Sequence, residues 1–193
     1  MEKIRSRSFK YKFGMPEVFA MIVGTVFLVA IGILMRNASL PYVLETEAIV
    51  IVVVATLFGP SAGGVIAVGA TLVYIAFLHV DTSFVHILAY ILLSAGIGHY
   101  ANDFGVRDGT FNAVKALDFC VIHLLLEGFV WMFFIPFFEF LLFRKNLFDA
   151  LEKSTYSLIF TTVTDVILVP LFFAISRMIV RRQKRSEKSS LLS

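Results

Sequence analysis

The sequence predicts an all-α integral membrane protein with six transmembrane helices. It is strongly apolar, it has few charged residues, and an uncharged turn rich in Gly and Pro separates two of its apolar segments. The chain has 193 residues, of which 59% are hydrophobic and only 16% are charged. Soluble domains average about 25% charged residues, and a soluble chain of this size cannot bury so much apolar surface. We therefore expect a single membrane domain over residues 1–193.

Six charge-poor segments follow one another along the chain, and each is expected to cross the bilayer as a helix. A spanning helix needs about 20 predominantly apolar residues. The strands of a membrane β-barrel are shorter and alternate in polarity, a pattern that these segments lack. The expected spans lie at about 16–35, 47–59, 62–79, 84–102, 115–138 and 155–178.

The second and third segments are short, and the turn between them is what identifies them as a pair of helices. No Asp, Glu, Lys or Arg occurs between Glu47 and Asp81. Within this interval, Gly59, Pro60 and Gly63 provide the turn chemistry that reverses the chain. We expect two membrane helices joined by a tight, uncharged corner.

Basic residues gather in the two tails, 1–14 and 180–193. Six spans place both tails on one side of the membrane, and the positive-inside rule makes that side cytoplasmic, so the topology is N-in and C-in. The net charge of +3 then serves to set topology and to meet anionic lipid. Nucleic acid is not an expected partner, because the aromatic and basic platform that binds it is missing.

Two acidic residues, Glu127 and Asp165, lie inside the last two expected spans. An ionisable side chain in hydrocarbon is costly and normally faces the interior of a bundle or a cavity. At about 1.5 Å per residue, both acids fall at a similar depth, between the middle and the outer third of the membrane. His123, Glu127 and Trp131 follow at intervals of four residues and share one helix face. We expect a cavity between the fifth and sixth spans.

Further polar and aromatic residues from the outer loops and helix ends are expected to complete a small-ligand pocket of this kind. They are Tyr42, Asp81, His86, Tyr156 and Thr162. The alternative is that the acids and His123 only link neighbouring helices, with a contribution of about 0.6–2 kcal/mol for each link.

No catalytic residue, cofactor or metal site is expected. His99/Asp103 and His123/Glu127 are both His-x-x-x-acid pairs, but they lie at different depths, and a zinc ion needs its ligands within about 2.0–2.2 Å. The sequences typical of zinc proteases, serine hydrolases and P-loop enzymes are absent. Cys120 is the only cysteine, so no disulfide framework forms.

Ala20 and Gly24 form a small-x-x-x-small pair on the first span, which permits close helix contact either within the chain or with another subunit. With these residues, the Phe58–Pro60 corner and the Asp165–Pro170 stretch of the last span, the chain resembles the substrate-binding S components of energy-coupling factor (ECF) transporters. The second docking position is Gly24, where the family has alanine.

The resemblance implies a binding subunit in the plasma membrane of a prokaryote that takes up a vitamin or related micronutrient. The ligand would lie near the outer leaflet, under the first outer loop and among the last three helices. Ala20 and Gly24 would dock on a coupling membrane subunit that is driven by two ATPase subunits. Two alternatives stay open: a membrane sensor or scaffold domain, and a metal-dependent intramembrane enzyme that uses the His-acid pairs.

Overall fold

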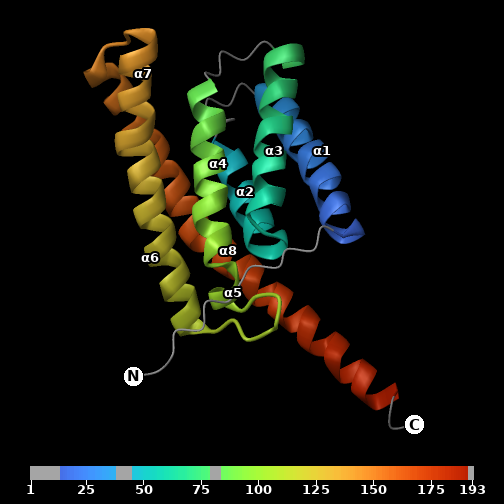
Figure 1. Ribbon diagram of the computed structural model, residues 1–193. Coiled ribbons are helices and arrows are strands. Elements are labelled where there is room, and N and C mark those ends of the chain that lie inside the picture. Colours follow the sequence, from blue (N-terminus) through green and yellow to red (C-terminus); the bar gives the residue numbers. More distant parts are fainter. Residues whose placement is uncertain (1–13, 38–44, 79–83, 191–193) are drawn as a thin grey trace.

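The computed structural model describes residues 14–37, 45–78 and 84–190. All regular secondary structure in these ranges is helical (Figure 1). Almost all of the N-terminal basic tail lies outside these ranges, whereas most of the C-terminal tail is described as backbone of the last helix, with side chains described only to Met178.

The helices form six rods that run up and down the molecule (Figure 1). Their bounds are α1 Met15–Asn37, α2 Glu45–Phe58, α3 Pro60–Val73 with the π-helical turn η1 Tyr74–Leu78, α4 Phe84–His99, the rod formed by α6 Ala113–Phe129, η2 Val130–Phe134 and α7 Ile135–Phe143, and α8 Leu147–Ser190. A short helix, α5 Ala101–Phe104, lies between α4 and α6.

Three of these helical stretches are long and apolar enough to cross a membrane, namely Met15–Leu34, Ala113–Phe143 and Leu147–Met178. Shorter apolar helices occupy Glu47–Phe58, Pro60–Ala76 and Phe84–His99. Length and composition thus identify a membrane protein with three qualifying helices among the described residues. The three shorter helices are apolar but fall below the length of a standard membrane-spanning helix.

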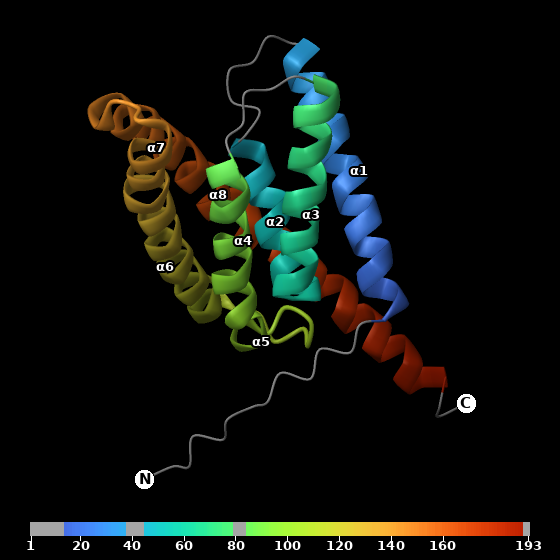
Figure 2. The ribbon, with the colours of Figure 1, turned by 45° about the horizontal axis from the view of Figure 1, so that its top comes forward.

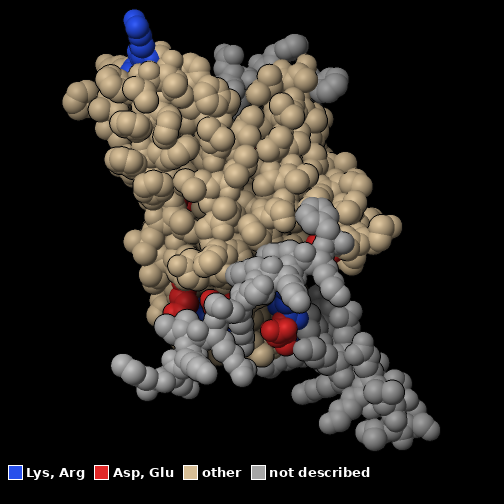
Figure 3. All heavy atoms as spheres, in the orientation of Figure 1, with Lys and Arg blue, Asp and Glu red and all other residues tan. Residues whose placement is uncertain are grey.

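The surface agrees with this assignment. A broad band of uncharged side chains covers the upper and middle parts of the face in Figure 3, and the charged side chains lie mainly at its two ends. Many large apolar side chains are open to the surroundings, for example Phe19 at 70% and Leu125 at 69% exposure. Such contiguous apolar surface is typical of a protein that contacts lipid.

The last helix is longer than the sequence predicts, because it begins at Leu147 rather than near 155 and continues past 178. Arg144 ends α7 with a left-handed backbone at φ 53°, and the Asn146 side chain accepts a hydrogen bond from the Phe148 amide at 3.0 Å. Hydropathy marks the apolar part of a helix and misses its polar first turns. Within this helix lies Pro170.

The uncharged corner consists of one residue, Gly59, between α2 and α3. Its φ of 97° is one that favours glycine, and Pro60 follows at the first position of α3. Ser94 of α4 donates a hydrogen bond to the Pro60 carbonyl at 2.7 Å, and the Arg107 guanidinium donates to the Leu57 carbonyl. The corner lies toward the end of the molecule where α1 begins and α8 ends (Figures 1 and 2).

Candidate binding site

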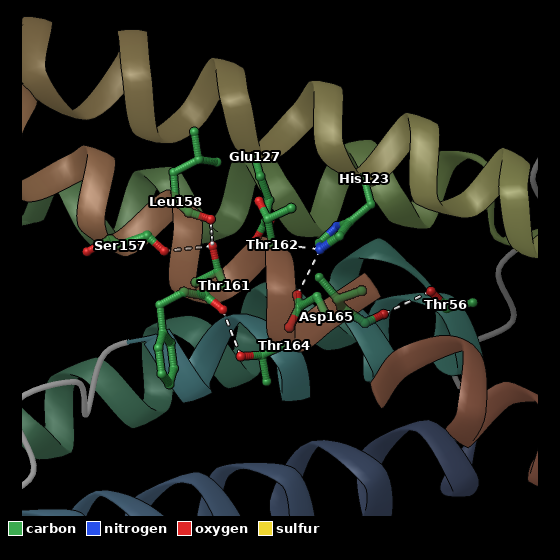
Figure 4. A network of polar contacts seen from close by, with 11 residues as sticks. Thr56, His123, Glu127, Ser157, Leu158, Thr161, Thr162, Thr164 and Asp165 are labelled. Carbon is green, nitrogen blue, oxygen red and sulfur yellow. Dashed lines mark hydrogen bonds and ion pairs between the residues drawn. The ribbon is translucent and has the colours of Figure 1, made fainter. Parts of the chain in front are cut away.

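A compact polar cluster lies where α6 and α8 face each other in the helix bundle (Figure 4). His123 Nε2 is 2.7 Å from Asp165 Oδ2 and 3.5 Å from Glu127 Oε1. All three side chains are fully buried. We call His123, Glu127 and Asp165 the His–carboxylate cluster.

Helix periodicity explains how two elements supply this cluster. His123 and Glu127 are four residues apart on α6 and therefore share one face. Asp165 comes from α8, where Thr162 lies three residues earlier and donates a hydrogen bond from Oγ1 to Glu127 Oε2 at 3.1 Å. The Phe119 ring stacks on the His123 ring, with centroids 5.3 Å apart and planes inclined by 16°. The imidazole is thus held on one side by an aromatic ring.

The cluster retains hydrogen-bonding capacity that the described residues leave unused. His123 Nδ1, Glu127 Oε1 and Asp165 Oδ1 are buried and have no hydrogen-bond partner within the described part of the chain. More than about 90% of buried polar groups in folded proteins are hydrogen-bonded. Three such atoms on adjoining side chains are therefore typical of a place where another chemical group binds.

An aromatic group follows the cluster along the α6 rod. Trp131 lies on η2, one turn beyond Glu127, and its ring centroid is 6.1 Å from that of His86 and 6.4 Å from that of Tyr90. Trp131 Nε1 is also buried without a hydrogen-bond partner among the described residues. The π-helical turn changes the direction of the side chains there, and π-turns inside α-helices occur frequently at functional sites.

The structure thus arranges six of the residues that the sequence singles out in two groups. One holds His123, Glu127, Asp165 and Thr162, and the other is the ring pair of His86 and Trp131. Tyr156 lies on α8 with 58% of its surface exposed. Tyr42 and Asp81 fall outside the described residues.

Tyr90 is a residue that sequence reasoning missed. It is 1% exposed and its ring packs edge-on against Trp131. Tyr90 follows His86 by four residues on α4, so the two share one helix face. The same spacing places His123 and Glu127 on one face of α6 and could have identified Tyr90.

Both expected docking residues line one apolar groove, but Gly24 also packs against α3 of the same chain. Gly24 is buried, and a Cβ at this position would collide with Ile66 of α3, so its small size serves a contact within the chain. Ala20 lines an apolar groove of about 750 Å³ between α1, α2 and α8. None of the His–carboxylate cluster residues lines that groove.

The same cluster also changes the interpretation of the His-acid pairs. From the sequence, His99/Asp103 and His123/Glu127 lie at different depths and are not expected to form one metal site, and in the structure His99 and Asp103 are exposed. The structure instead completes the second pair with Asp165, and one ligand atom from each of His123, Glu127 and Asp165 lies within 4.8 Å of the others.

The fold and the cluster define an all-α membrane protein with a buried ionisable centre. Comparison of the chain with protein-family models, curated proteins and solved structures finds no match.

Proposed function

We propose that this chain is the substrate-binding subunit of an ECF-type importer in the plasma membrane of a prokaryote. In this function all six helical rods cross the bilayer, with both tails on the cytoplasmic side. The chain binds a vitamin-like small molecule from outside and performs no chemistry itself. A coupling membrane subunit and two ATPase subunits supply the energy.

The buried His–carboxylate cluster is the observation that carries the proposal. Ionisable residues inside a membrane bundle are expensive and mark binding or conduction paths. The neighbouring Trp131 and Tyr90 rings add apolar walls, and Trp131 Nε1 adds an unused donor. Apolar walls with a few convergent polar groups are typical of small-ligand sites. A scaffold domain has no need for such a centre.

The layout of the chain supports the importer in particular. The start of α1 and the end of α8 lie toward the same end of the bundle (Figure 2), which agrees with an even number of crossings. The groove beside Ala20 presents uncharged surface from α1, α2 and α8, and this surface is where a coupling subunit would dock.

The test is to purify the full chain in mild detergent and identify the small molecule that co-purifies with it by mass spectrometry. The affinity of that molecule is then compared between the wild type and the variants Glu127→Gln and Glu139→Gln. Glu139 is a matched control because it is a buried carboxylate that pairs with Lys145 at 2.8 Å, outside the cluster.

We expect Glu127→Gln to weaken binding at least tenfold, because a neutral amide replaces the carboxylate that Thr162 orients. Glu139→Gln should bind like the wild type. Equal affinity in all three proteins would remove the cluster from the ligand site. Absence of any vitamin-like molecule that binds the wild type would overturn the function itself.

A further inference from the structure

We propose that His123, Glu127 and Asp165 bind one divalent transition-metal ion, with Zn²⁺ as its representative. This site does not depend on the importer function, because it follows from the ligand atoms, their charges and their burial. The ion would join α6 to α8 in the interior of the bundle.

The donor set is the first argument. Imidazole nitrogen and carboxylate oxygen are ordinary ligands of zinc and other first-row metals. One atom from each of the three side chains lies within 4.8 Å of the other two. Two helices supply these ligands, so their relative positions are fixed by helix packing rather than by a loop.

The distances are the second argument. Around a tetrahedral ion with ligands at about 2.0–2.2 Å, neighbouring ligand atoms are about 3.3–3.6 Å apart. His123 Nε2 and Glu127 Oε1 are already 3.5 Å apart. His123 Nε2 and Asp165 Oδ2 are 2.7 Å apart, a hydrogen-bond distance, so this pair must open by about 0.7 Å. Rotation of the carboxylate can supply that movement.

Charge balance is the third argument. When both carboxylates are ionised they carry a combined charge of −2, and a single imidazolium neutralises only half of it. A divalent cation held with a neutral imidazole balances both carboxylates. Because uncompensated charge is strongly unfavourable in a buried site, the divalent ion is the better partner for this cluster.

The surroundings are the fourth argument. Metal-ligating carboxylates are normally oriented by further hydrogen bonds, and Thr162 Oγ1 donates such a bond to Glu127 Oε2 at 3.1 Å. This bond leaves Glu127 Oε1, which has no hydrogen-bond partner among the described residues, to coordinate the ion. The stacked Phe119 ring limits the rotation of His123. Three protein ligands leave a fourth position for water or for a donor atom of a ligand.

The experiment uses the purified full chain, stripped with a chelator and then dialysed against Zn²⁺ or Co²⁺. The bound metal is counted by mass spectrometry, and the visible absorption of Co²⁺ reports its ligands. The compared proteins are the wild type, Asp165→Asn, Thr162→Val and the control Glu139→Gln, whose carboxylate lies outside the cluster. No ATPase or coupling subunit is present, so the result is independent of transport.

We expect one ion per chain in the wild type and in Glu139→Gln. Asp165→Asn should bind at least 100-fold more weakly, because a ligand is lost. Thr162→Val keeps all three ligands and should lose about tenfold, the lower end of the effect of orienting residues. Added Zn²⁺ should raise the unfolding temperature of the wild type and of Glu139→Gln but not that of Asp165→Asn.

Several outcomes would overturn the site. The first is a wild type that takes up neither metal stoichiometrically, and the second is an Asp165→Asn variant that binds metal as tightly as the wild type. Because Asp165→Asn also removes the charged acceptor of a buried hydrogen bond and so perturbs folding, the Thr162→Val result stands as an independent criterion. Unchanged metal affinity in Thr162→Val, or an equal loss in Glu139→Gln, would contradict the proposed ligands.

Discussion

Replacement of Gly98 by alanine should loosen the contact between α4 and the α2–α3 corner. A Cβ at position 98 would lie 2.6 Å from the Pro60 nitrogen and 2.7 Å from the Pro60 Cα and Cβ. Ordinary contacts begin near 3.4 Å, so α4 or the corner must move by about 0.7 Å. Since the obstacle is mostly backbone at a rigid proline, no side-chain rotation relieves it.

The magnitude follows from two opposing effects. Overpacking a well-packed interior destabilises by about 1–3 kcal/mol, whereas glycine to alanine inside a helix stabilises by about 0.5–1 kcal/mol. The net expectation for Gly98→Ala is a loss of about 1 kcal/mol, within a range of about 0–2.5 kcal/mol. Gly64→Ala is the matched control, because Gly64 also lies in a helix but a Cβ there meets nothing within 4 Å.

The assay is thermal unfolding of both variants in the same detergent, followed by loss of the monodisperse peak in gel filtration. Gly98→Ala should unfold at a lower temperature than the wild type, and Gly64→Ala at an equal or higher one. A Gly98→Ala protein as stable as Gly64→Ala would refute the close contact at the corner. Because α4 carries Tyr90, a displaced α4 should also weaken ligand binding.

Two further predictions concern a helix cap and the groove. Asn112 Oδ1 accepts a hydrogen bond from the Lys115 amide at 3.0 Å and so caps α6. Asn112→Ala should therefore lower the stability by about 1 kcal/mol in thermal unfolding. An unchanged unfolding midpoint would contradict this capping role. Under the proposed importer function, Ala20→Leu should reduce uptake while ligand binding stays within twofold, because Ala20 lines the groove rather than the cluster. Equal uptake would remove the groove as the docking face.

The helical class of the fold could be predicted from the sequence, because apolar length alone identifies helices such as α1 and the α6–α7 rod. The extent of α8 could not, since its polar first turns carry no hydropathy signal. Helix periodicity likewise placed His123 beside Glu127. Periodicity does not say which face of α8 packs against His123 and Glu127. Only the packing of the two helices shows that His123 is closer to Asp165, at 2.7 Å, than to Glu127, at 3.5 Å.

The partner of the small-residue pair on α1 could not be predicted from the sequence. The spacing of Ala20 and Gly24 indicates close approach of a second helix but does not say which helix approaches. The structure shows Gly24 against Ile66 of α3, a partner within the chain. A Gly24→Leu substitution would therefore disturb folding before it tested docking.

The proline in α8 has a mechanical consequence. Pro170 lacks an N–H, so the hydrogen bond to the carbonyl four residues earlier, that of Val166, is not made. Val166 directly follows Asp165 of the cluster, and the 44-residue helix continues beyond it toward the basic end of the chain. The bending stiffness of α8 is therefore lowest within about one turn of the buried centre, and a small tilt at this point is amplified with distance along the remaining helix.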